Sequence, residues 1–306
     1  MAFLNALPGA VAQGLIWGLM AIGVYISYKI LDIADLTVDG SICTGGCVFA
    51  VLLAMGCPVW LCVLLAFLAG ALTGVLTGLF HTALGIPSIL AGILTQLILY
   101  SANLSILGGK SLMAVDHRNN ALLLHMSDKP GAIITLALII AAVIIGLWLF
   151  FYTEVGLTLK STGDNPDMSR AQGVNVKRNK VIGLAISNGI VALAGALLTQ
   201  YKGSANINDG RGAIVIGLAA IFIGLSVSLK IKPNFVVSLI GVVGGGIVYY
   251  VIYSFVIMMG LDTEYLKMIS ATIVVLFLGV PYLKSEYFTK HKQVLPAKTE
   301  GGGKDA

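Results

Sequence analysis

The chain has 306 residues, of which 58% are hydrophobic and only 11% are charged, and its formal net charge is +5. A soluble domain carries about 25% charged residues, so this composition excludes a chain that covers itself with a water-facing surface. Lipid is the simplest alternative, because backbone polar groups inside a bilayer must be satisfied within each segment, and this makes the spans helices. Nucleic-acid binding is not indicated, because most Lys and Arg lie in two tracts, 160–180 and 284–304, beside apolar runs.

Apolar segments of about 20 residues can cross the hydrocarbon layer of a membrane. The sequence predicts nine of them, with eight to ten as the range: 9–28, 41–57, 58–80, 86–107, 130–152, 181–200, 212–229, 233–259 and 266–283. The predicted fold class is therefore an all-α, polytopic transmembrane helical bundle in residues 1–284. Residues 30–47 fit either a re-entrant or broken element or a plain loop. Residues 285–306 are predicted to form a disordered, polar cytoplasmic tail.

Charge around the spans predicts the orientation, since Lys and Arg concentrate on the cytoplasmic side. With the N-terminus outside and nine alternating spans, most of the 19 Lys and Arg fall inside, including the tracts at 160–180 and 284–304. The C-terminus is then cytoplasmic.

Small residues within the spans indicate close helix packing. Gly70, Gly74 and Gly78 are spaced four apart and share a helix face, and so do Cys43 and Cys47. No carboxylate or His is placed near these cysteines in a zinc-ligand pattern, so no metal site is predicted.

Polar side chains inside the spans have two interpretations. Buried amides can line a solute pathway, or they can hydrogen-bond neighbouring helices; both remain open for Gln96, Asn103, Asn188 and Gln200. Asp32, Asp35 and Asp39 must face water, protein or a cavity, because a charge in the bilayer centre is costly. Asp39-Gly40-Ser41 is typical of a cap before the span at 41–57. Asp39 could instead act as a gate or contact a substrate amine.

The loop at 156–180 contains a short predicted helix, Pro166 to Gln172. Asn165 is a suitable N-cap, Pro166 suits the first helical position, Asp167 matches the positive helix end and Gly173 is a natural C-terminal residue. Two turns are too few for a stable isolated helix, so the segment should dock on something. It is either an ordinary capped loop helix or a rigid knob for a soluble partner.

Three stretches carry a family resemblance that covers roughly residues 10 to 285. Residues 162–176, Thr-Gly-Asp-Asn-Pro-Asp-Met-Ser-Arg-Ala-Gln-Gly-Val-Asn-Val, resemble the cytoplasmic loop of ABC-transporter permeases of the branched-chain amino acid and ribose type. Residues 35–41, Asp-Leu-Thr-Val-Asp-Gly-Ser, resemble an element of the tryptophan/tyrosine permease subgroup. Residues 184–200 resemble the helix after the coupling loop. Gly189 and Cys43 depart from the subgroup pattern, and these departures affect only packing.

The resemblance implies a role and partners. It implies that the chain is the permease subunit of a bacterial importer in the plasma membrane. The expected cargo is a small solute, namely an amino acid, with an aromatic amino acid as one option, and it would be moved by alternating access. Its implied partners are a second permease subunit in a homodimer, a cytoplasmic ATPase that uses ATP-Mg, and an extracytoplasmic substrate-binding lipoprotein. The implied coupling residues are Asn165, Pro166, Asp167, Met168, Arg170 and Gly173.

Catalysis within the chain is not expected. Gly109-Lys110-Ser111 ends like a phosphate-binding loop, but Leu104 stands where that motif requires Gly. No cofactor, catalytic residue or metal ligand is therefore predicted. The alternatives are a permease of the same family for a sugar, nucleoside or other small solute, or a secondary transporter; the latter lacks a carboxylate deep in the spans between residues 58 and 259.

Overall fold

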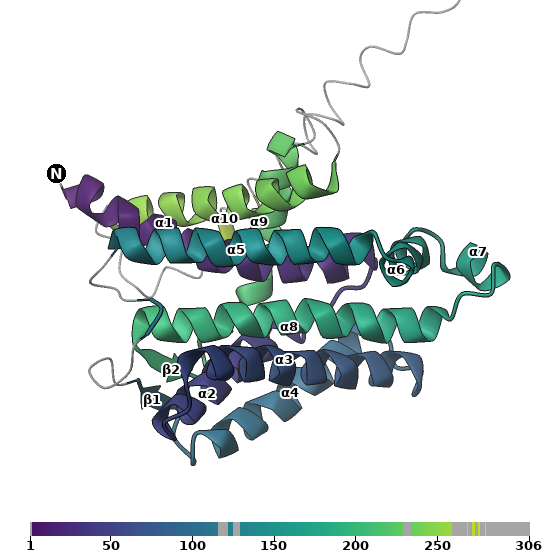
Figure 1. Cartoon of the computed structure of the whole chain (residues 1–306), viewed down its shortest axis with the longest axis horizontal. Helices are drawn as coiled ribbons and strands as arrows, with labels where there is room; N and C mark the ends of the chain where they lie inside the picture. The colour runs from purple at the N-terminus through teal and green to yellow at the C-terminus, as the bar shows by residue number, and fades with distance from the viewer. Residues whose placement is uncertain are drawn as a thin grey trace, which may run out of the picture.

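The computed structural model describes residues 2–115, 122–124, 129–228 and 234–258, together with Met268, Ala271, Thr272, Val275 and Gly279. These residues form a helical bundle with one small two-stranded sheet (Figure 1). The helices are α1 (Ala2–Tyr25), α2 (Val38–Ala54), α3 (Val59–Thr82), α4 (Ser88–Ile106), α5 (Lys129–Phe151), α6 (Glu154–Asp164), α7 (Pro166–Ala171), α8 (Val176–Lys202), α9 (Ala213–Ser228) and α10 (Phe235–Met258). A π-helical turn, Ile26–Ile30, extends α1, and strands β1 (Leu112–Ala114) and β2 (Ser204–Asn206) pair antiparallel.

Six helices of the described part are long and apolar enough to cross a membrane. They are Leu7–Ile30, Val59–Thr82, Ser88–Ile106, Pro130–Phe151, Val176–Lys202 and Phe235–Met258, and α2 and α9 are shorter apolar helices. The predicted all-α polytopic bundle is confirmed, and eight of the nine predicted spans coincide with these helices. The ninth, 266–283, and the tail at 285–306 lie almost wholly outside the described residues.

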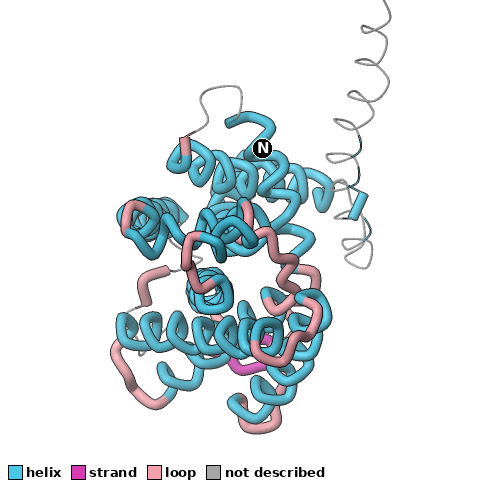
Figure 2. Tube along the Cα trace, turned by 90° about the vertical axis from the view of Figure 1, so that its right-hand side faces the viewer, coloured by secondary structure: helices cyan, strands magenta, loops and turns pink. Residues whose placement is uncertain are grey.

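Helix α8 lies at the centre of the bundle and is the most buried long helix after α1. Helix α3 packs along it through the predicted glycine ladder: a Cβ at Gly70 would meet Ala192, one at Gly74 the Leu184 carbonyl and one at Gly78 the Val181 backbone. Because side chains are absent at these crossings, the two backbones approach closely. Figure 2 shows the bundle from the end at which α6 and α7 lie.

Helix α2 begins inside the bundle instead of at its end. Residues 31–37 are non-helical, yet Leu31, Ile33, Asp35 and Thr37 are all buried. Non-helical backbone at this depth is tolerated where protein surrounds it. The broken-element interpretation of 30–47 is therefore confirmed over that of a plain loop.

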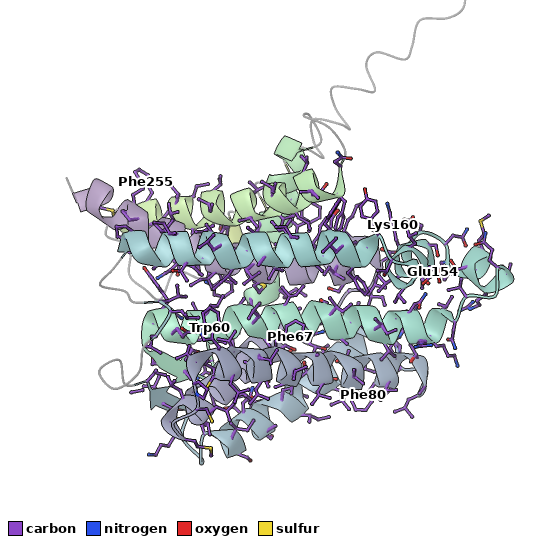
Figure 3. All side chains as sticks on the ribbon, in the orientation of Figure 1. Trp60, Phe67, Phe80, Glu154, Lys160 and Phe255 are labelled. Atoms are coloured by element: carbon purple, nitrogen blue, oxygen red, sulfur yellow. The ribbon has the colours of Figure 1, made fainter. Side chains whose placement is uncertain are left out.

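The outer faces of α3, α4 and α5 are covered with exposed apolar side chains. Trp60 and Leu72 of α3 and Leu138 of α5 are each more than half exposed, and Figure 3 shows Trp60 among the side chains of this surface. A surface of this composition suits lipid or an apolar protein partner.

Candidate functional site

Helix α7 has the predicted geometry at both ends. The Oδ1 atom of Asn165 accepts a hydrogen bond from the Met168 amide at 3.0 Å, and Pro166 occupies the first helical position. Gly173, two residues beyond the helix, has φ +82°, a conformation that favours glycine. The predicted short helix is thus confirmed, one residue shorter than expected.

Helix α6 precedes α7 and was not predicted. Its N-cap is Thr153, whose hydroxyl accepts from the Gly156 amide at 3.3 Å, and Glu154 lies in its first turn. Thr followed by Glu is a recognisable N-terminal signal, so the sequence did contain the information. Figure 3 labels Glu154 and Lys160 of α6 at this end of the bundle.

Helix α7 docks on the bundle by one face only. The hydroxyl of Ser169, a buried residue, donates to the Asn165 carbonyl at 2.9 Å and lies 3.3 Å from the Ser161 hydroxyl of α6, and Asn179 of α8 donates to Thr162 of α6 at 3.0 Å. The opposite face is open: Met168 is 61% exposed, and the Asp167–Arg170 ion pair at 2.7 Å also lies on the surface. The result is a short, capped projection at one end of the protein (Figure 1).

A cavity of about 450 Å³ lies between α2, α4 and residues 207–211. Three predicted pathway residues line it, namely Asp39, Gln96 and Asn103. Helix α4 contributes residues three or four apart, so one face of that helix forms a wall: Ile93, Gln96, Leu97, Tyr100 and Asn103. The volume of this cavity and its mixture of polar and apolar lining residues match those of small-molecule sites, whose volumes are about 300–1,000 Å³.

Asn103 is the cavity residue with unused hydrogen-bonding capacity. It is 1% exposed, and among the described residues its Oδ1 atom has no hydrogen-bond partner. A buried polar atom of this kind is costly unless something pairs with it. A solute in the cavity could supply that partner.

Asp39 caps a helix other than the one predicted. Helix α2 begins at Val38 with Thr37 as its N-cap, so the expected cap at Asp39-Gly40-Ser41 is wrong. The Asp39 carboxylate instead accepts from the amides of Gly212 and Ile214, both at 2.9 Å, at the N-terminus of α9. Sequence spacing could not reveal this, because the two elements are far apart in the chain.

Asn188 belongs to a buried network on the α3 side of α8. Its amide donates to Asp35 Oδ2 at 2.6 Å, and its Oδ1 accepts from Ser41. Ser41 also bonds Thr73, at 2.7 Å. Nearby, the Thr77 hydroxyl bonds both Thr37 and Thr95; these threonines were missed by sequence reasoning, although Thr73 and Thr77 share a helix face. In this conformation the Asn188 amide joins helices.

Gln200 lies near the sheet end of α8, away from the cavity lining. Its Oε1 accepts from the Leu123 amide at 3.2 Å, and among the described residues its Nε2 has no hydrogen-bond partner. The structure therefore brings together Asp39, Gln96 and Asn103, and it leaves Asn188 and Gln200 elsewhere.

Within the described residues, no cluster of three His, Cys, Asp or Glu could hold a metal ion. Cys43, the cavity cysteine, donates to the Ile207 carbonyl at 3.2 Å and accepts from the Gly210 amide at 3.1 Å. These bonds tie α2 to the turn at 207–210.

The apolar bundle, the cavity beside α4 and the projecting capped helix together fit a multi-pass membrane permease. The sequence profile of the family described as branched-chain amino acid transport system, permease component, matches residues 7–278. The chain belongs to this family of ABC transport permeases.

Two of the relatives align with nearly the whole chain, and a third aligns with about two thirds of it. The chain is 33% identical to the tyrosine transport system permease protein of Clostridioides difficile (strain R20291), over 96% of this chain and 97% of the relative. It is 32% identical to the uncharacterized protein RP368 of Rickettsia prowazekii (strain Madrid E), over 92% and 99%. The autoinducer 2 import system permease protein of Yersinia pestis (strain Pestoides F) is 29% identical over 67% of this chain and 58% of the relative. No solved structure matches significantly.

Proposed function

We propose that the chain is the permease subunit of a bacterial ATP-driven importer and forms the translocation pathway for an amino acid. Family membership supports the transport role, and the similarity to a tyrosine transport permease over nearly the whole chain supports the amino-acid substrate. ATP-Mg would be bound and hydrolysed by a separate ATPase. A second copy of this chain and an extracytoplasmic binding lipoprotein would complete the complex.

The cavity between α2 and α4 would form part of the pathway. Asp39 and the uncharged amides of Gln96 and Asn103 give it the mixed lining that a polar solute needs. Asn188 and Gln200 would contribute when the helices move, because both side chains hydrogen-bond across elements and would exchange partners. Alternating access requires such rearrangement.

Coupling to the ATPase would run through Asn165, Pro166, Asp167, Met168, Arg170 and Gly173 at α7. The observation that carries this proposal is the capped helix that projects from the bundle with one face open. Because α7 is hydrogen-bonded to α6, and α6 to α8, a displacement of α7 would be transmitted to the central helix α8.

The coupling role predicts that Asn165→Ala uncouples transport. Losing the N-cap costs about 0.5–2 kcal/mol, enough to loosen a six-residue helix, whereas Asn165→Asp retains a capping oxygen and should keep most activity. Gly173→Val should act like Asn165→Ala, because φ +82° strains a β-branched residue. The measurement is ATP-dependent uptake in proteoliposomes, with membrane insertion as control.

Two results decide the coupling proposal. We expect a loss of uptake of at least about tenfold in Asn165→Ala with normal amounts of inserted protein. Uptake at the parental rate in both Asn165→Ala and Gly173→Val would refute the role of α7.

A further inference from the structure

A second cavity, of about 460 Å³, lies between α1, α10 and the segment that links β2 to α9. Four aromatic residues form part of its lining, Trp17 from α1 and Tyr249, Tyr250 and Tyr253 from α10, and Val215 and Ile216 of α9 and Ala271 complete the apolar part. The Trp17 and Tyr250 rings stack with centroids 5.8 Å apart, and those of Tyr250 and Tyr253 are 5.6 Å apart. Aromatic faces grouped around an open volume can receive another ring by stacking or edge-to-face contact.

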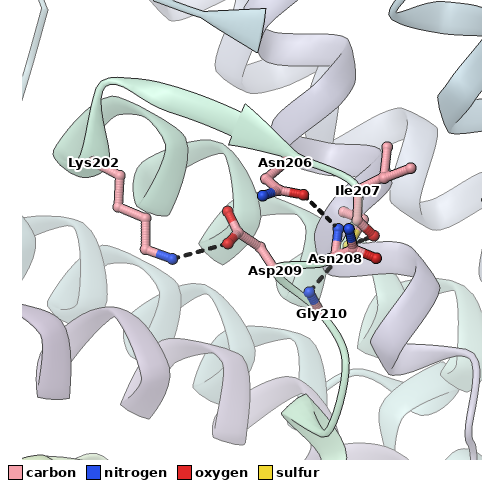
Figure 4. A network of polar contacts seen from close by, with 7 residues as sticks. Lys202, Asn206, Ile207, Asn208, Asp209 and Gly210 are labelled. Carbon is pink, nitrogen blue, oxygen red and sulfur yellow. Dashed lines mark hydrogen bonds and ion pairs between the residues drawn. The ribbon is translucent and has the colours of Figure 1, made fainter. Parts of the chain in front are cut away.

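Charged side chains of both signs line the same cavity. Lys202 ends α8 and pairs with Asp209 at 3.0 Å, and Arg211 lies beside them. Figure 4 shows the Lys202–Asp209 pair and the turn at Asn206–Gly210 that presents it. The turn is held by the Asn206 side chain, which accepts from the Asn208 amide at 2.9 Å. A carboxylate has room for further donors, and a guanidinium can hold a carboxylate through two parallel hydrogen bonds.

We propose that this aromatic cavity binds a zwitterionic aromatic amino acid, with its ring among Trp17, Tyr250 and Tyr253 and its ammonium and carboxylate groups at Asp209 and Arg211. This inference rests on the proposed function and names the substrate class. The combination is specific: an aliphatic amino acid would satisfy the charges without the ring contacts, and an uncharged aromatic compound would satisfy only the rings. Cation–π attraction to the tyrosine rings would add to the binding of the ammonium group.

The aromatic cavity also borders the first cavity. Arg211 lines both, and residues 207–212 lie between them. Asp39 holds the amides of Gly212 and Ile214 from the other side. A solute bound at Asp209 and Arg211 would therefore contact the segment that separates the two cavities.

Tryptophan fluorescence can test the aromatic cavity in the full-length chain. The chain has three Trp residues, and Trp17 is 5% exposed, whereas Trp60 and Trp148 are 68% and 40% exposed. A Trp60→Phe/Trp148→Phe variant in lipid nanodiscs therefore leaves Trp17 as the reporter. We expect a saturable fluorescence change with L-phenylalanine and none with L-leucine at the same concentrations.

Substitutions on this background separate ring from charge recognition. Tyr253 is only half-buried, so Tyr253→Leu should fold, and we expect about five- to tenfold weaker L-phenylalanine binding because one ring contact is lost. Tyr253→Phe keeps the ring and should bind within about twofold of the parent. Asp209→Asn should weaken L-phenylalanine but not 3-phenylpropionate, which lacks the ammonium group.

Three results would overturn the proposal that the aromatic cavity binds an aromatic amino acid. They are an equal response to L-leucine, no saturable response to L-phenylalanine, and L-phenylalanine binding at the parental affinity by both Tyr253→Leu and Asp209→Asn. These results are independent of the proposed function, which fails if the assembled complex shows no ATP-dependent uptake. Uptake without a Trp17 response refutes only the binding site, and a Trp17 response without uptake refutes only the importer role.

Discussion

Single residues in this protein perform tasks that their sequence neighbourhood does not reveal. Asp39 lies in the first turn of α2 but hydrogen-bonds the first amides of α9, more than 170 positions away in the chain. The two shorter apolar helices, α2 and α9, are thus joined at their N-termini inside the bundle. The Asp39 carboxylate is favourably placed near the positive ends of both helix dipoles. It also accepts hydrogen bonds from backbone amides of α9 that would otherwise be buried without a partner.

Replacing Asp39 with Asn should therefore destabilise the protein. The amide retains one acceptor oxygen and turns an NH2 group toward the second backbone N–H, so a buried amide loses its partner at a cost of about 1–3 kcal/mol. We expect the Tm of the purified chain to fall by several degrees. Asp32→Asn makes the same chemical change at an exposed residue with φ 54°, which Asn tolerates, and should change Tm little. Equal Tm values for the two variants would show that Asp39 does not hold α9.

The residue scale also marks the limit of sequence reasoning about the site. Gln96 and Asn103 could be selected as polar residues in an apolar span, and they do line one cavity with Asp39. Arg211 and Tyr100 were not selected, because an Arg in a loop and a Tyr in a span are unremarkable until the fold brings them together. Asn188 is likewise a polar residue in an apolar span, yet its side chain hydrogen-bonds Asp35 and does not line the cavity. Only tertiary geometry separates these cases.

At the element scale, helices with strong local signals were predictable. Apolar length located the spans, and the cap at Asn165 located α7 within one residue. The start of α2 was not predictable, because the non-helical residues 31–37 are stabilised by contacts with distant elements, such as the bond from Asn188 to Asp35. Local propensity carries no information about those contacts.

Glycine spacing on α3 gives a test of element packing. In Gly74→Ala the new Cβ would meet the Leu184 carbonyl and the Ala185 backbone, and overpacking of this kind costs about 1–3 kcal/mol. Gly146→Ala changes another helical glycine that has nothing within 4 Å of the added Cβ, and it should be neutral or stabilising because alanine favours helix. Thermal unfolding in detergent should separate the two. A Gly74→Ala Tm equal to that of Gly146→Ala would contradict the close α3–α8 packing.

For the whole molecule, the two ends of the bundle differ in chemistry. One end carries α6 and α7, and the other carries the β1–β2 sheet (Figure 1). Basic residues cluster around the α7 end in the tract 160–180, and by the positive-inside rule that end should be cytoplasmic. The two ends would then serve different partners, the ATPase at α7 and the binding lipoprotein near the sheet.

Labelling in intact cells can test this orientation. Met168 on α7 and Ser111 beside β1 are both exposed, so Met168→Cys and Ser111→Cys can be compared in a Cys57→Ser background, where the other three cysteines are buried. A membrane-impermeant maleimide should label Ser111→Cys in intact cells and Met168→Cys only after the membrane is opened. The reverse pattern would invert the topology and remove α7 from the reach of a cytoplasmic ATPase.

The most direct test of the account is amino-acid uptake by purified components in proteoliposomes. We predict that accumulation of labelled amino acid requires this chain, the ATPase with ATP-Mg, and the binding lipoprotein together. The chain alone should transport nothing in response to a proton or sodium gradient. Gradient-driven accumulation by the chain alone would contradict the assignment of an ATP-driven permease subunit.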